Sequence, residues 1–250
     1  MSHHTIDVTG LGFSYPDGTA ALEDVSFHIG HGESVAIVGA NGAGKSTLLM
    51  HLNGFLMPAR GTVNIGGTPV AKGTLADIRK TVGMVFQDPD DQLFMPSVFE
   101  DVAFGPMNLG LPAEQVATRA REALERVGAS KLGDRPPYRL SGGEKRAVAI
   151  ATVLAMSASI LVMDEPTSNL DPRARRRLIE LLQGFEHTKI VATHDLDMAL
   201  ELCDRTIVMS AGRIMADGPT LEIFADDELL DASGLERPLS MRACPLCGNS

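Results

Sequence analysis

The chain has 250 residues and a formal net charge of −10, from 22 Lys and Arg against 32 Asp and Glu. An acidic balance of this size argues against a protein that binds nucleic acid backbones through its overall charge. Hydrophobic residues at 44% and charged residues at 22% are typical of a globular protein and argue against a disordered one. Three cysteines are too few for a disulfide framework, and the N-terminal residues form no apolar signal segment, so we expect a cytosolic protein.

The N-terminal part of the chain predicts short strands on either side of a glycine-rich loop. Apolar residues alternate over residues 6–15, with a turn around Gly10, and again over residues 22–29 as an antiparallel strand. Residues 34–38 are a short apolar run that leads into the glycine-rich loop and a helix. Residues 61–70 then return to short strands joined by a hairpin turn.

The middle of the chain differs in kind, because prolines punctuate it and its periodicity becomes helical. Residues 98–103 and 113–127 are predicted helices, and the second carries its apolar side chains along one face. We therefore expect a helical subdomain, about residues 90–155, inserted into an α/β core.

Later apolar runs, separated by helical runs, predict further core strands, at residues 160–163, 189–192 and 206–209. Residues 147–163 form a stretch of 17 residues without a charge, at the lower limit of a membrane span. Its modest hydrophobicity favours a helix over about residues 144–156 followed by a buried strand. The predicted domain spans residues 5–240, and residues 241–250 are an irregular tail.

The glycine-rich loop carries the first chemical motif. Residues 39–46 match G-x-x-x-x-G-K-[ST] between a predicted strand and a predicted helix, the context that the motif requires. Backbone N–H groups of such a loop surround a phosphate, and the helix dipole favours the anion. Lys45 is placed to reach the β- and γ-phosphates, and Ser46 to coordinate Mg²⁺. A glycine-rich turn with a surface lysine is the weaker alternative. We predict a nucleoside triphosphate site formed by Gly39, Ala40, Asn41, Gly42, Ala43, Gly44, Lys45, Ser46 and Thr47.

Two adjacent carboxylates follow a buried strand. Asp164 comes directly after the apolar run that begins at Ile160, so we expect it at the carboxyl end of a strand, where α/β sites form. Asp164 would hold Mg²⁺ through water, and Glu165 would polarise the attacking water as general base. The alternative, a solvated Asp-Glu turn before Pro166, is less compatible with the phosphate loop in the same chain.

A third motif gives the family resemblance. Residues 140–144, Leu-Ser-Gly-Gly-Glu, precede a helix and alone would be an ordinary helix N-cap. In order with residues 39–47 and 160–165, they make the chain resemble the ATP-binding cassette (ABC) ATPases over roughly residues 5–225. The resemblance implies an α/β fold with a P-loop NTPase core, an antiparallel β subdomain and an inserted α-helical subdomain.

The resemblance implies roles for further residues. Tyr15 falls where the family stacks an aromatic ring on adenine, although a core aromatic at a strand end is an alternative. Gln87 follows the predicted strand 82–86, like the family's glutamine that senses Mg²⁺ and water. Residues 168–171 resemble the loop that crosses between subunits, and His194 matches the histidine that contacts the γ-phosphate.

The family's architecture also implies a dimer. Its two ATPase domains sandwich two nucleotides, so Ser141, Gly142 and Gly143 of one chain would serve the ATP of the other. A single copy of each motif therefore implies two chains, which we expect to be identical. Glu144 departs from the glutamine more frequent in the family; it can still begin a helix, although a carboxylate near triphosphate is electrostatically less favourable.

The segments around Gln87 indicate a subtype. Residues 86–94, 97–106 and 136–144 look like those of energy-coupling factor (ECF) transporter ATPases, most similar to the cobalt/nickel import type. The resemblance implies an ATPase at the cytoplasmic face of the membrane, docked on a coupling subunit and a substrate-binding subunit. We interpret the nearby carboxylates as solvated or helix-capping groups and not as a cargo site: Asp88, Asp90 and Asp91.

Two other functions remain open at this point. One is the ATPase subunit of another ABC importer, for a vitamin, an amino acid or a different ion. The other is an ABC-type ATPase of DNA repair or translation, but the segment between Gln87 and Leu140 is too short for the coiled-coil insertions of that class. The net negative charge of the chain also argues against a function that requires binding to nucleic acid.

Cys244 and Cys247 have the spacing of half a zinc site. A closed tetrahedral site needs four ligands, so a mobile reduced tail and a metal site shared across a dimer are both compatible with the sequence.

Overall fold

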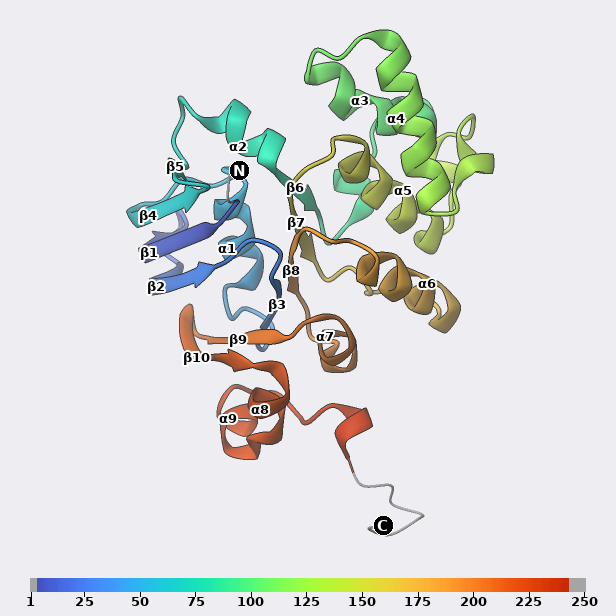
Figure 1. Ribbon diagram of the computed structural model, residues 1–250. Coiled ribbons are helices and arrows are strands. Elements are labelled where there is room, and N and C mark those ends of the chain that lie inside the picture. The colour runs from blue at the N-terminus through green and yellow to red at the C-terminus, as the bar shows by residue number, and fades with distance from the viewer. Residues whose placement is uncertain (1–3, 243–250) are drawn as a thin grey trace.

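The computed structural model describes residues 4–242, which form two sheets and the helices around them (Figure 1). The larger sheet has six strands in the order β10-β9-β3-β8-β7-β6. All of them run parallel except β10, which pairs antiparallel with β9. The strands are β3 (Ser34–Val38), β6 (Val82–Val85), β7 (Ile160–Asp164), β8 (Thr188–Ala192), β9 (Arg205–Ser210) and β10 (Arg213–Pro219).

The smaller sheet is antiparallel, in the order β2-β1-β4-β5. Its strands are β1 (Ile6–Ser14), β2 (Ala20–Ile29), β4 (Arg60–Ile65) and β5 (Thr68–Pro69). The expected turn around Gly10 is wrong, because β1 continues through this position. The pairing register of β1 and β2 shifts between Val8 and Leu11, and Gly10 has a φ of 58°. A bulge therefore absorbs the extra residue without ending the strand.

The helices lie on both faces of the larger sheet. They are α1 (Lys45–Leu52), α2 (Leu75–Thr81), α3 (Val98–Asn108), α4 (Ala113–Arg126), α5 (Gly142–Ala155), α6 (Pro172–Gln183), α7 (Leu196–Leu202), α8 (Thr220–Ala225) and α9 (Asp227–Ala232). Helix α1 packs between the two sheets, whereas α3 and α4 pack on α5 at one side of the molecule. The α/β architecture predicted from the sequence is confirmed.

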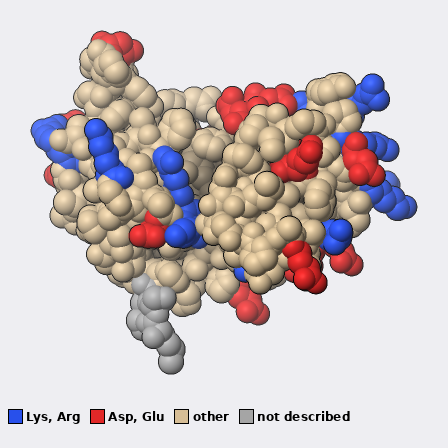
Figure 2. All heavy atoms as spheres, turned by 90° about the horizontal axis from the view of Figure 1, so that it is seen from above, with Lys and Arg blue, Asp and Glu red and all other residues tan. Residues whose placement is uncertain are grey.

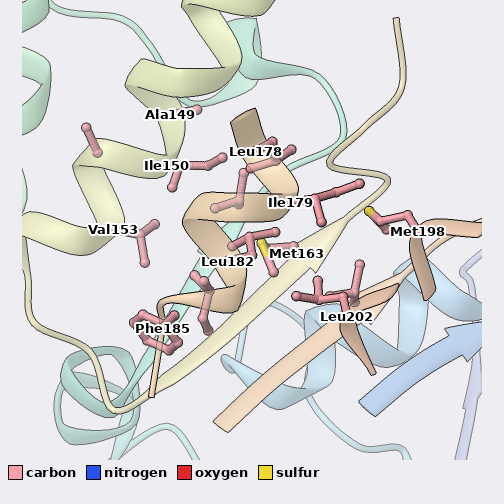
Figure 3. Close-up of a cluster of buried hydrophobic side chains, with 14 of the residues drawn as sticks. Ala149, Ile150, Val153, Met163, Leu178, Ile179, Leu182, Phe185, Met198 and Leu202 are labelled. Carbon is pink, nitrogen blue, oxygen red and sulfur yellow. The ribbon is translucent and has the colours of Figure 1, made fainter. Parts of the chain in front are cut away.

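The alternation of side chains along the parallel strands separates two cores. Val35 and Ile37 of β3 face the core shared with α1 and the smaller sheet, and Ala36 and Val38 face the opposite core. In that second core, side chains of α5, α6 and α7 converge on β7 (Figure 3). Because both faces are covered, β3 and β7 are apolar almost throughout, as their sequences predict.

Helix α3 is longer than the sequence analysis predicted. It continues past Ala103 to Asn108 with Pro106 inside it. Val98, Val102 and Pro106 are spaced four residues apart and are all buried, so the packing of one continuous face outweighs the missing proline N–H. Pro106 therefore does not end the helix, and the end predicted at Ala103 is wrong.

The uncharged stretch 147–163 divides as predicted between α5 and β7. Among residues 4–242, the structure contains no helix with both the length and the apolar character needed to cross a membrane. The sequence analysis did not identify four elements, namely α2, β10, α8 and α9.

The contact between α5 and β6 gives a prediction for stability. A Cβ at Gly83 would collide with Val153 and lie 3.1 Å from the Ala158 Cβ. We expect Gly83→Ala to lower the free energy of unfolding by about 1–3 kcal/mol, the usual cost of overpacking. Gly73→Ala is the matched control, because no atom lies within 4 Å of its Cβ position. Equal denaturant midpoints for the two variants would contradict the close packing of α5 on β6.

Candidate functional site

The glycine-rich loop joins the end of β3 to the start of α1. Gly39 has a φ of 156°, and a Cβ there would collide with the carbonyl oxygen of Met209. Gly44 has a φ of 100°, and its Cβ would lie 2.6 Å from the carbonyl oxygen of Ala21. Both positions therefore require glycine, because the loop passes directly against neighbouring backbone.

Lys45 places its ammonium inside this loop. Its Nζ donates hydrogen bonds to the carbonyl oxygens of Gly39 at 2.8 Å and Ala40 at 3.2 Å. Burial lowers the pKa of Lys45, while the carboxylates of Glu165 and Asp164 favour its charged form. The positive charge is thus held in the mouth of the loop, where an anionic ligand would meet it.

A cleft of about 330 Å³ contains most of the predicted nucleotide-site residues. Tyr15 lies on its wall, and the Tyr15 hydroxyl is 3.0 Å from the Thr47 Oγ1. The ring meets Phe13 edge to face at 5.2 Å and is 37% exposed, so Tyr15 is not a core aromatic. The predicted residues that line the cleft are Tyr15, Asn41, Gly42, Ala43, Gly44, Lys45, Ser46, Thr47, Gln87, Asp164 and Glu165.

Asp164 ends β7 and is buried at the base of the cleft. Burial raises the pKa of its carboxyl, and a hydrogen bond from Ser46 opposes that shift. The Asp164 Oδ1 has no hydrogen-bond partner in the structure. A buried, unpartnered carboxylate oxygen beside a serine hydroxyl is a donor set that suits Mg²⁺, a hard cation that prefers oxygen ligands.

Glu165 lies directly beyond Asp164 with a positive φ of 45°. Its Oε2 accepts hydrogen bonds from the Thr193 Oγ1 at 3.2 Å and the His194 backbone N–H at 3.3 Å. The same oxygen lies 2.8 Å from the Nδ1 of His194, whose side chain is largely exposed. Because Asp164 and Ala192 are paired in the parallel register of β7 and β8, Glu165 and His194 follow the same edge of the sheet.

Gln87 lies after β6, and a side chain from α5 holds its backbone. Arg146 donates from Nη1 to the carbonyl oxygen of Phe86 at 2.7 Å and from Nη2 to that of Gln87 at 2.6 Å. Arg146 is buried, and burial lowers its pKa. The sequence analysis missed this residue, because one arginine within a helical stretch carries no motif of its own.

The residues of the third motif form the start of α5. Ser141 accepts a hydrogen bond from the Glu144 N–H, and Glu144 accepts one from the Ser141 N–H at 2.8 Å, which makes a complete capping box. This hydrogen bond lowers the pKa of Glu144. Ser141, Gly142 and Gly143 do not line the cleft that contains Lys45. Ser141 and Gly143 line a separate pocket, whereas Gly142 shares a neighbouring pocket with Ser46, Gln87 and Asp164. Ser141 and Gly142 are exposed.

The acidic residues after Gln87 have local partners. Asp88 caps the short 3-10 helix Pro89–Asp91, and Asp90 forms an ion pair with Lys145 at 2.6 Å. No group of three His, Cys, Asp or Glu suited to a metal ion occurs within residues 4–242. Asp88 is thus a helix-capping carboxylate, and Asp90 and Asp91 are exposed. Cys244 and Cys247 lie outside the described residues.

A buried parallel sheet, a glycine-rich loop that leads into a helix and an acidic residue at the end of a neighbouring strand together define a P-loop nucleoside triphosphatase. The sequence model of the ABC transporter family matches residues 22–168. The chain belongs to this family, as an ATPase domain of the ABC type.

Relatives of known sequence or structure support this assignment over nearly the whole chain. A putative ABC transporter ATP-binding protein of Geobacter sulfurreducens is 66% identical over 99% of this chain and 100% of its own length. The energy-coupling factor transporter ATP-binding protein EcfA of Methanocaldococcus jannaschii is 46% identical over 94% of this chain and 86% of its own length. The solved structure of cbiO1 from Clostridium perfringens, part of the ABC transporter complex cbiONQ, is 40% identical with a TM-score of 0.80. It covers 92% of this chain and 94% of its own.

The burial of Asp164 gives a prediction for the ATP-free protein. We expect Asp164→Asn to raise the free energy of unfolding by about 1 kcal/mol at pH 7, because it removes a desolvated charge at a functional site. The folded-state pKa of Asp164 is raised, so lowering the pH protonates the wild type and reduces the difference between the two proteins. Denaturant titrations at pH 7 and pH 4.5 measure this change.

Asp231→Asn is the control for that titration, because Asp231 is exposed on α9. We expect it to leave stability unchanged at both pH values. A destabilised Asp164→Asn variant would contradict the inferred cost of burying this carboxylate.

Proposed function

We propose that this chain is the ATP-hydrolysing subunit of an ECF-type ABC importer that energises uptake of cobalt or nickel ions. The observation that carries the transporter type is its likeness, over more than nine-tenths of both chains, to a protein that is part of the cbiONQ complex. The similarity to EcfA supports the same type. The metal cargo rests on the resemblance of residues 86–94, 97–106 and 136–144 to the cobalt/nickel import type.

The residues of the cleft have complementary roles in this proposal. Tyr15 stacks on the adenine of ATP, and the N–H groups of residues 39–47 hold its phosphates. Lys45 neutralises charge on the β- and γ-phosphates. The oxygens of Ser46, Gln87 and Asp164 would hold Mg²⁺, which would neutralise phosphate charge when bound.

Glu165 acts as the general base. Its carboxylate contacts the segment that follows β8, where Thr193 and His194 fix one of its oxygens. Glu165 also lines the cleft, where its carboxylate can accept a proton from the attacking water. His194 contacts the γ-phosphate once ATP is bound.

A second copy of the chain completes each ATP site. Ser141 and Gly142 are exposed and do not line the cleft of their own chain, although the first turn of α5 offers N–H groups suited to a phosphate. Docking two copies head to tail would bring these groups to the partner's nucleotide. The capping box keeps Glu144 engaged with the Ser141 N–H, which limits the electrostatic penalty of its carboxylate.

Two partly exposed aromatic pairs, one of which includes the neighbour of Gln87 in the chain, support docking on a membrane subunit. Phe94 is 63% exposed and meets Phe104 edge to face at 5.0 Å. Phe55, 60% exposed, meets Phe86 in the same way at 6.0 Å. Exposed apolar side chains grouped in this way mark an interaction surface. We infer that a helix of the coupling subunit binds here, on the cytoplasmic face of the membrane.

The distribution of charge opposes nucleic acid as a partner. On the face that Figure 2 shows, Lys and Arg are interspersed with Asp and Glu. A nucleic-acid-binding face would instead gather basic side chains into a continuous patch. The formal charge of −10 acts in the same direction.

Uptake of labelled Co²⁺ and Ni²⁺ tests the proposal, in cells that carry this chain with its membrane partners. We expect uptake of at least one ion in the wild type, and a fall of about 100-fold or more in Glu165→Gln, because the variant binds ATP but lacks the general base. Glu228→Gln, a neutralised carboxylate exposed on α9, is the matched control and should transport normally.

Hydrolysis without uptake of either ion would reject the metal cargo and favour another ABC importer, for a vitamin or a different ion. Hydrolysis at the wild-type rate in Glu165→Gln would reject Glu165 as the base.

A further inference from the structure

The carboxylate of Asp195 joins three segments around the candidate site. Its Oδ1 accepts hydrogen bonds from the Arg175 Nη2 and the Met198 N–H, each at 2.9 Å. Its Oδ2 accepts from the Arg175 Nε at 2.7 Å and from the Thr167 Oγ1 at 3.2 Å. Asp195 therefore caps α7, forms a bidentate ion pair with α6 and holds the turn that follows Glu165.

The backbone of Asp195 continues this network to the candidate base. The Asp195 N–H donates to the Thr193 Oγ1 at 3.0 Å, and that hydroxyl donates to the Glu165 Oε2 at 3.2 Å. His194, between these two residues, contacts the same Glu165 oxygen. The position of His194 and the orientation of Glu165 are thus fixed from the side of Asp195.

The ion pair is shielded enough from solvent to restrain this geometry. The side chains of Arg175 and Asp195 are 25% and 21% exposed. Burial opposes ionisation of Asp195, but its hydrogen bonds, those from Arg175 foremost, outweigh burial and hold its pKa below the ordinary value. A bidentate guanidinium–carboxylate pair also fixes orientation, which a single ammonium contact does not.

Arg175 links this network to the loop that precedes α6. It lies in the first turns of α6, whose N-cap Asp171 accepts hydrogen bonds from the N–H groups of Arg173 and Ala174. Residues 168–171 are therefore joined through a capped helix start to Arg175. A displacement of this loop would move the guanidinium against Asp195.

We infer that Arg175 is a positioning residue which, through Asp195, sets the geometry of His194 and Glu165 and couples it to the loop 168–171. The inference rests on the proposed function, since it assumes that His194 and Glu165 serve ATP hydrolysis. Arg175 itself does not line the cleft that contains Lys45, so its effect on the reaction is indirect.

Steady-state ATP hydrolysis by the full chain tests the inference. We expect Arg175→Gln to lower kcat about tenfold or more, because small displacements of reacting groups are costly, and to change KM for ATP less than about twofold. Arg175→Lys keeps the charge but not the bidentate geometry, so we expect an intermediate kcat. Arg176→Gln is the matched control: Arg176 also bridges α6 and α7, through Glu201, but does not contact Asp195.

Each outcome bears on the inference. A wild-type kcat in Arg175→Gln, or an equal loss of kcat in Arg176→Gln, would overturn it, because the effect would then be absent or merely structural. If Arg175→Gln does not fold, Thr167→Val removes a different contact to Asp195, and an unchanged kcat would overturn the inference. A wild-type chain that fails to hydrolyse ATP would reject the proposed function itself.

Discussion

The positions of the glycine-rich loop, Glu165 and His194 depend on where three buried parallel strands end. The strands β3, β8 and β7 are neighbours in the larger sheet, and Ile37, Ala192 and Asp164 lie in one line across it. The chain beyond that line carries the glycine-rich loop, the segment with His194, and Glu165. Because both faces of the sheet are covered by apolar cores, a slip of one residue would move each strand side chain into the opposite core and disrupt the packing of both. The sheet register therefore fixes the order of groups at the site.

Burial of charged side chains at the carboxyl ends of these strands lowers the stability of the folded chain, but it leaves polar groups that a bound ligand can satisfy. The side chains of Lys45, Asp164 and Arg146 are all buried, and burial acts against the charged form of each. Their mutual attraction offsets part of this cost, but the Asp164 Oδ1 and the Arg146 Nε have no hydrogen-bond partner. Such incompletely satisfied groups are typical of sites that are completed by a ligand.

Local patterns predicted the site better than they predicted the interactions that support it. Loop 39–46 and Asp164 could be identified because their chemistry requires fixed residue types at fixed spacing next to a strand. Arg146 and Arg175 could not be identified in this way. Arg146 contacts Gln87, 59 residues away, and Arg175 contacts Asp195, 20 residues away, so each contact forms only when the chain folds. The same limit explains α3, where contacts with other helices, and not the local effect of Pro106, determine the helix end.

Helix α5 is a single rigid element with two separate contacts. Its first turn presents Ser141 and Gly142 at the surface, and its second turn holds the carbonyl groups of Phe86 and Gln87 through Arg146. Binding at either place is then thermodynamically linked to binding at the other. A ligand that favours one orientation of α5 at its N-terminus strengthens the binding of a protein beside Phe86 that favours the same orientation. That protein then strengthens ligand binding by the same factor. This linkage between the two binding places requires a change in the orientation of α5 alone.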